Sequence, residues 1–108
     1  MTLDIQVAQT ILNQLGGAQF AALTGARNFV SGADFLQFSL PSGAKSHINK
    51  VRITLDPSDT YTVEFFNLNL RAGLCSLVSE RSDIYCDNLQ DLFESETGLY
   101  VTLFARRG

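Results

Sequence analysis

The segment that decides the fold is VRITLDPSDTYTVEFF, residues 51–66. Apolar and polar side chains alternate on both sides of the tetrapeptide DPSD. The alternating apolar residues are Val51, Ile53 and Leu55 before it, and Tyr61, Val63 and Phe65 after it. A period of two indicates strands with one buried face. DPSD has proline at its second position, which favours a β-turn. The segment therefore predicts two antiparallel strands joined by a tight turn.

The residues on either side of this segment extend the predicted sheet. RNFV (27–30) and FLQFSL (35–40) flank a turn at 31–34, which predicts a second hairpin with Leu36, Phe38 and Leu40 on one face. Pro41-Ser42-Gly43 ends that hairpin. After residue 66 the segment RAGLCSLVSE (71–80) fits either a short fifth strand or an irregular return, and the pattern does not decide between them.

Helical patterns lie near both ends of the chain. Apolar residues recur at helical spacing over 2–15, with Thr2 as the expected N-cap and Gly16-Gly17 as the stop; a second short helix is expected at 18–23. Residues 82–98 predict the last helix, with Ser82 as N-cap and Gly98 after its end. Its expected apolar face consists of Tyr85, Leu89, Leu92 and Phe93.

These elements predict one α+β domain over residues 1–108. An antiparallel meander of four to five strands is covered by an N-terminal and a C-terminal amphipathic helix. The composition agrees, since 45% of the residues are hydrophobic and 18% are charged. The net charge of −3 argues against bulk affinity for nucleic-acid backbones or anionic membranes. No apolar run is long enough to span a bilayer, and the first residues do not resemble a signal peptide, so we expect a cytoplasmic protein.

The predicted last helix carries four carboxylates on its polar side: Asp83, Asp87, Asp91 and Glu94. Like charges four residues apart on a helix cost a few tenths of a kcal/mol per pair. Four interpretations are open: a solvated face, a docking surface for a basic partner, a contact with the chain's own basic segment, or a divalent-metal site. The metal interpretation is disfavoured because a straight helix lacks a looped oxygen cage. The docking surface is the functional interpretation that we carry forward.

The basic segment SGAKSHINKVR (42–52) holds Lys45, His47, Lys50 and Arg52. Beside strand aromatics such as Phe35 or Phe66, its cations could contact single-stranded nucleic acid. An ordinary solvated loop is the alternative. Cys75 and Cys86 form no CxxC pair and are expected to be reduced packing residues. No catalytic or cofactor motif is found, so we expect a protein that is not an enzyme and has no cofactor or metal.

Three segments carry a family resemblance. AQTILNQLGGAQFAALTGARNFV (8–30), VRITLDPSDTYTVEFF (51–66) and NLQDLFESETGLY (88–100) together resemble a family of small uncharacterised proteins of bacteriophages and other mobile genetic elements. Residues 67–83 depart most from that pattern. The resemblance implies a phage-associated protein in a bacterial host cell. It implies no activity and no catalytic residue.

The sequence therefore supports three functional hypotheses. The first is a non-enzymatic binder of a host protein, acting through Asp83, Asp87, Asp91 and Glu94 as an inhibitor of a nucleic-acid-handling defence complex, in the manner of an anti-CRISPR protein. The second is a nucleic-acid-associated accessory protein that uses Lys45, Lys50 and Arg52. The third is a homo-oligomeric structural protein whose contact is the uncharged polar face of the first helix, Gln6, Gln9, Thr10, Asn13 and Gln14.

Overall fold

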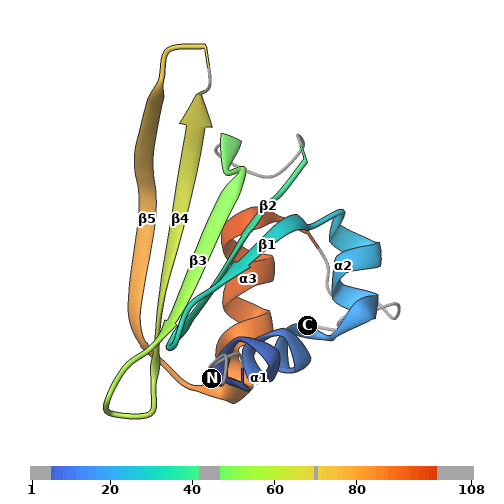
Figure 1. Ribbon diagram of the computed structural model, residues 1–108, viewed down its shortest axis with the longest axis vertical. Coiled ribbons are helices and arrows are strands. Elements are labelled where there is room, and N and C mark those ends of the chain that lie inside the picture. Colours follow the sequence, from blue (N-terminus) through green and yellow to red (C-terminus); the bar gives the residue numbers. More distant parts are fainter. Residues whose placement is uncertain (1–5, 42–46, 70, 100–108) are drawn as a thin grey trace.

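The computed structural model describes residues 6–41, 47–69 and 71–99 of the chain. These residues form an α+β fold with one five-stranded antiparallel sheet and three α-helices (Figure 1). The strands follow the chain order across the sheet, so the sheet is a simple meander. The elements are α1 (Gln6–Leu15), α2 (Ala18–Thr24), β1 (Arg27–Ser31), β2 (Phe35–Ser39), β3 (Lys50–Leu55), β4 (Tyr61–Asn69), β5 (Leu74–Ile84), the 3₁₀ turn η2 (Cys86–Asn88) and α3 (Leu89–Thr97).

The central hairpin forms as its alternating pattern predicts. β3 pairs with β4 from Lys50↔Phe66 to Leu55↔Tyr61; Val51, Ile53, Tyr61, Val63 and Phe65 are buried, and Leu55 is half-buried. In the turn, the Asp56 N–H donates to the Thr60 carbonyl at 2.8 Å, and the Thr62 hydroxyl donates to the Asp56 carboxylate at 2.7 Å. The predicted β1–β2 hairpin is also confirmed, with a bulge in β1.

The three helices lie on one side of the sheet (Figure 1). α1 and α3 were expected there, although Thr2, the expected N-cap of α1, lies outside the described residues. α2 ends at Gly25, whose φ of 75° favours glycine; a Cβ there would lie 2.9 Å from Pro41 Cγ. This close approach seats the end of α2 against the irregular segment that follows β2.

The core lies between the helices and the inner face of β2, β3 and β4. Its centre is a cluster of three buried rings, Phe20 of α2, Phe38 of β2 and Phe93 of α3, with ring centroids 5.2 to 6.2 Å apart. Phe20 makes edge-to-face contacts with both other rings, and such contacts add to the stabilisation from burial alone. Because the three rings come from three elements, the cluster fixes α2 and α3 on the same face of the sheet.

The C-terminal part of the fold differs from the prediction. Residues 71–80, left undecided between strand and return, mostly belong to β5, an eleven-residue edge strand. The helix predicted over 82–98 begins only at Leu89, because Ser82–Ile84 continue β5 and Ile84 pairs with Tyr61. Ile84 packs against the core from this position. That burial favours strand over helix at residues whose local pattern fits both.

Candidate functional site

Both edge strands of the described fold are exposed, and β5, with eleven residues, is the longer of the two. Figure 1 shows the β4–β5 hairpin extending past the other strands and away from the helices. Nine of the eleven residues of β5 are exposed. Apart from Ile84, the core does not extend to this strand, and two of its residues on the inner face are polar: Ser79 lies opposite Phe65, and Arg81 lies opposite Val63.

Large apolar side chains gather on this exposed strand. Seven large hydrophobic residues are exposed among those described, and four of them lie within residues 74–85. These four are Leu74 (60% exposed), Leu77 (51%), Val78 (38%) and Tyr85 (59%). Tyr85 was expected on the apolar face of a helix, and that expectation was wrong: it lies in extended backbone between β5 and η2. Aromatic side chains with this exposure are enriched at protein interfaces.

The predicted acidic stripe does not exist as one helical face. Asp83 lies in β5 with a φ of 59°, and Asp87 lies in η2; only Asp91 and Glu94 lie on α3. Asp83, Asp87 and Asp91 are exposed, Glu94 is half-buried, and Asp91 and Glu94 already take part in interactions within the chain. The helical spacing in the sequence identified these carboxylates but assigned Asp83 and Asp87 to a helix, whereas they lie in β5 and η2.

The acidic residues nevertheless share one part of the chain. Residues 80–97 contain six of the eleven acidic residues and one of the eight basic residues, so this segment carries −5 and the remainder of the chain +2. Its one cation, Arg81, donates to the Glu96 carboxylate at 3.1 Å and joins β5 to α3. We call the exposed side chains of Leu74, Leu77, Val78, Asp83, Tyr85 and Asp87 the β5 surface.

Lys50 and Arg52 lie on the outer face of the sheet, away from the helices. Lys50 Nζ lies 5.7 Å from the centroid of the Phe66 ring, and Arg52 Cζ lies 5.4 Å from that of Phe35. Arg52 also donates two hydrogen bonds to Gln37 Oε1, at 2.9 and 3.1 Å. The structure thus brings Lys50 and Arg52 together with the two aromatic residues predicted to stack with bases. Lys45 lies outside the described residues.

Two acidic residues reduce the positive potential of that outer face. Glu64 lies opposite Arg52 in the β3–β4 pairing, and Glu80 lies opposite Glu64 in the β4–β5 pairing. Both rings are already covered by a cation at about the distance of a cation–π contact. A base would have to share each ring with that cation or displace it.

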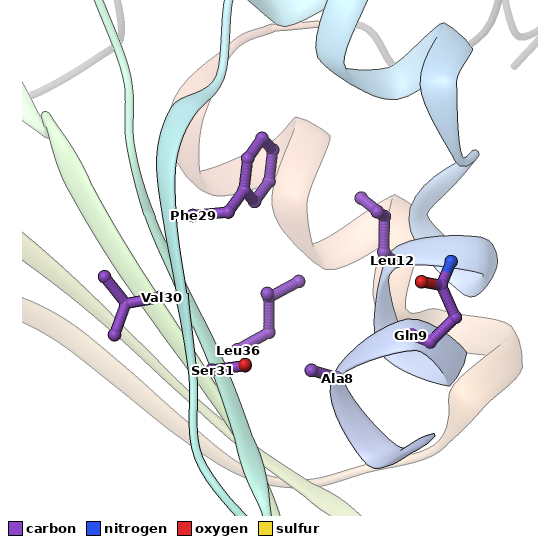
Figure 2. Close-up of a pocket in the computed structure, with 7 residues that line it drawn as sticks. All are labelled: Ala8, Gln9, Leu12, Phe29, Val30, Ser31 and Leu36. Atoms are coloured by element: carbon purple, nitrogen blue, oxygen red, sulfur yellow. The ribbon is translucent and has the colours of Figure 1, made fainter. Parts of the chain in front are cut away.

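An apolar pocket of about 190 Å³ lies between α1 and β1 (Figure 2). Figure 2 shows Phe29 and Leu36 on the strand side and Leu12 on the helix side, with Gln9 at the margin. No charged side chain lines it. A pocket with these walls could accept an aliphatic or aromatic side chain, but it offers little to orient a polar substrate.

Among residues 6–41, 47–69 and 71–99, no group of three His, Cys, Asp or Glu side chains is placed to hold a metal ion. The cysteines Cys75 and Cys86 are free and exposed, so the packing role predicted for them was wrong. Burial raises the pKa of Tyr61, whose hydroxyl donates to Gln14 Oε1 at 2.8 Å. This hydrogen bond joins β4 to α1 and occupies part of the polar helix face that was predicted as an oligomer contact.

No protein-family model, curated protein or solved structure matches this chain. Within the described part of the chain, no helix has the length and apolar character needed to cross a bilayer. Any functional conclusion must therefore come from the surfaces described above.

Proposed function

We propose that this protein is a non-enzymatic protein-binding domain that docks through the β5 surface. The observation that carries the proposal is the exposure of Leu74, Leu77, Val78 and Tyr85 on or beside one uncovered edge strand. Leu74, Leu77 and Val78 lie within five residues of one strand, and neighbouring exposed apolar side chains indicate an interaction site, whereas single ones do not. An unpaired strand edge also offers backbone donors and acceptors to a partner.

The charge of the β5 surface defines the kind of partner. Asp83 and Asp87 flank Tyr85 in sequence, and all three side chains are exposed. A partner with basic groups around an apolar centre would match this distribution, and such complementarity speeds association and favours the correct partner. The resemblance to small phage proteins suggests a host protein in this role, including a component of a nucleic-acid-handling defence complex.

The experiment that tests the proposal is affinity capture from nuclease-treated bacterial lysate with three forms of the tagged protein. The first is the natural sequence, and the second is the variant Asp83→Asn/Tyr85→Ala/Asp87→Asn. The third is a charge-matched control, Asp34→Asn/Asp59→Asn, which removes two exposed carboxylates elsewhere. Asp91 and Glu94 are left intact because their interactions within the chain would confuse the result.

We expect a discrete protein to be captured by the natural sequence and the control but lost by the β5 variant. Equal capture by all three forms would contradict docking through this surface. Circular dichroism checks that the β5 variant remains folded, which is expected because all three side chains are exposed.

A second candidate function has its own observation in support. The clustering of Lys50 and Arg52 with Phe66 and Phe35 on one sheet face is suited to single-stranded nucleic acid. It ranks second because Glu64 and Glu80 lie on the same face. Fluorescence anisotropy with a labelled oligodeoxythymidine at low salt tests it: Lys50→Ala/Arg52→Ala should lose binding, whereas the control Arg27→Ala/Arg71→Ala should retain most of it. Absence of binding by the natural sequence at low salt would exclude this function.

A further inference from the structure

The free edge of β5 has two halves with different chemistry. Leu74–Val78 has the sequence LCSLV, without a charge or a proline, and all five residues are exposed. The second half carries Glu80, Arg81 and Asp83 and contains a register shift. Charges and bulges are the usual devices that keep edge strands from pairing with other chains. The first half has no charge, and its register shift falls only at its end, near Val78.

The first half is complementary to itself. If two copies pair antiparallel about a twofold axis at Ser76, Leu74 lies opposite Val78 and Cys75 lies opposite Leu77 of the other copy. Each apolar side chain then has an apolar partner across the strands, which is the pairing that stabilises sheets. In a twofold dimer the β5 edge of each copy hydrogen-bonds to that of the other, so neither β5 edge remains free to pair with a third copy.

The charges at the ends of the segment fit the same arrangement. Arg71 of each copy, in the turn before β5, comes near Glu80 and Arg81 of the other, and that Arg81 is already held by its ion pair with Glu96. Arg71 is exposed and has no ion-pair partner within the described residues. The antiparallel direction also places the two acidic halves at opposite ends, so that Asp83 and Asp87 of one copy do not face those of the other.

We propose that a second copy of this chain pairs with Leu74–Val78 of β5 and extends the five-stranded sheet into a continuous ten-stranded one. This inference rests on the proposed function, because it names the occupant of the apolar half of the β5 surface. The acidic half and Tyr85 stay accessible at both ends of the dimer for a different protein. The proposed pairing of Leu74–Val78 also replaces the polar face of α1 as the expected oligomer contact.

Sedimentation equilibrium of the full chain over a wide concentration range tests the proposal. The mass should rise with concentration toward twice 11.9 kDa. Leu77→Lys places a charge in the proposed contact and should hold the protein at the mass of one chain. The matched control is Val30→Lys, which places the same charge on the other edge strand at a side chain that is 49% exposed. It should dimerise like the natural sequence.

Three results would overturn the proposal: one-chain mass at every concentration, a dimer that survives Leu77→Lys, or a dimer lost equally in Val30→Lys. Hydrogen exchange provides a readout without substitution, because amides of residues 74–78 should exchange more slowly at high concentration. The variant Asp83→Asn/Tyr85→Ala/Asp87→Asn leaves Leu74–Val78 intact and should still dimerise. Loss of lysate capture with an intact dimer, or the reverse, therefore shows which of the two proposals fails.

Discussion

The sheet has a covered part and an uncovered part that are built from neighbouring strands of similar length. In β4, Tyr61, Val63 and Phe65 are buried beneath the helices, with exposed fractions of 4% or less. In β5, which pairs with β4 along nearly its whole length, nine of eleven residues are exposed. The two strands share backbone hydrogen bonding but not side-chain packing.

This difference separates what holds the fold together from what remains available for binding. Burying a large apolar side chain contributes about 1.5–3 kcal/mol, so β2 to β4 and the helices supply most of the stability. β5 contributes backbone pairing and the contact of Ile84 with the core. Its other apolar side chains gain little from folding as a single chain. Substitutions should therefore act on stability in the covered part and on association in β5.

The largest effect is expected from Phe38→Ala in the covered part. Phe38 is fully buried and contacts the rings of Phe20 and Phe93. Removing the ring leaves a cavity at the junction of three elements, which should lower the free energy of unfolding by about 3–5 kcal/mol. Urea denaturation followed by circular dichroism measures the loss. A loss of stability as small as that expected for Leu77→Ala on β5 would contradict the distinction between the covered and the uncovered part of the sheet.

A smaller effect is expected from Tyr61→Phe, at the margin of the covered part. The variant loses the hydrogen bond to Gln14, which should cost about 0.5–1.5 kcal/mol at neutral pH. Because burial raises the pKa of Tyr61, the folded protein holds this proton more firmly than the unfolded chain does. Stability associated with the neutral hydroxyl is thus complete below the ordinary tyrosine pKa of about 10 and is lost as the pH rises from there through the higher pKa of the folded protein.

Thermal unfolding from neutral to alkaline pH tests this second expectation. The difference in stability between the natural sequence and Tyr61→Phe should shrink above about pH 10. A difference that stays constant across that range would show that the ionisation of Tyr61 does not contribute.

The same contrast explains which elements could be predicted from sequence. β2, β3 and β4 have one buried and one outer face, so their alternation of apolar and polar residues predicts both the strands and the buried residues. β5 has no buried face, and LCSLVSERSDI accordingly shows no alternation. Only its pairing with β4 identifies it as a strand, and that information is not local.

The error in the last helix has a related cause. Leu89, Leu92 and Phe93 do lie on the inner side of α3, and helical spacing extends by coincidence to Tyr85. Nothing in the spacing shows that Ile84 packs on the core from a strand. The charge pattern of the sequence thus identified Asp83 and Asp87 of the β5 surface. It did not identify the exposed apolar residues Leu74, Leu77 and Val78. The uncharged run LCSLV was the available signal, and its strand propensity alone could not show that it is exposed.

A small effect is expected where the two parts are joined by the Arg81–Glu96 ion pair. The Arg81 side chain is 55% exposed and that of Glu96 17% exposed, so solvent screens much of the attraction. A double-mutant cycle with Arg81→Ala and Glu96→Ala should give a coupling of about 0.5 kcal/mol that decreases with salt. A coupling of several kcal/mol would mean that α3 depends on β5 more than the burial pattern indicates.

The smallest effect on stability is expected from Leu77→Ser, and it is the sharpest test of the comparison. Leu77 lies opposite Phe66 and is 51% exposed, so the free energy of unfolding measured in dilute solution should change by no more than about 0.5 kcal/mol. Solubility should nevertheless rise, because the variant interrupts an apolar, uncharged segment on a free strand edge. Concentration at the onset of precipitation measures this second property, with Val30→Ser on β1 as the control. Unchanged stability with raised solubility would show that this side chain acts between molecules, whereas a loss comparable to that of Phe38→Ala would place β5 within the folding core.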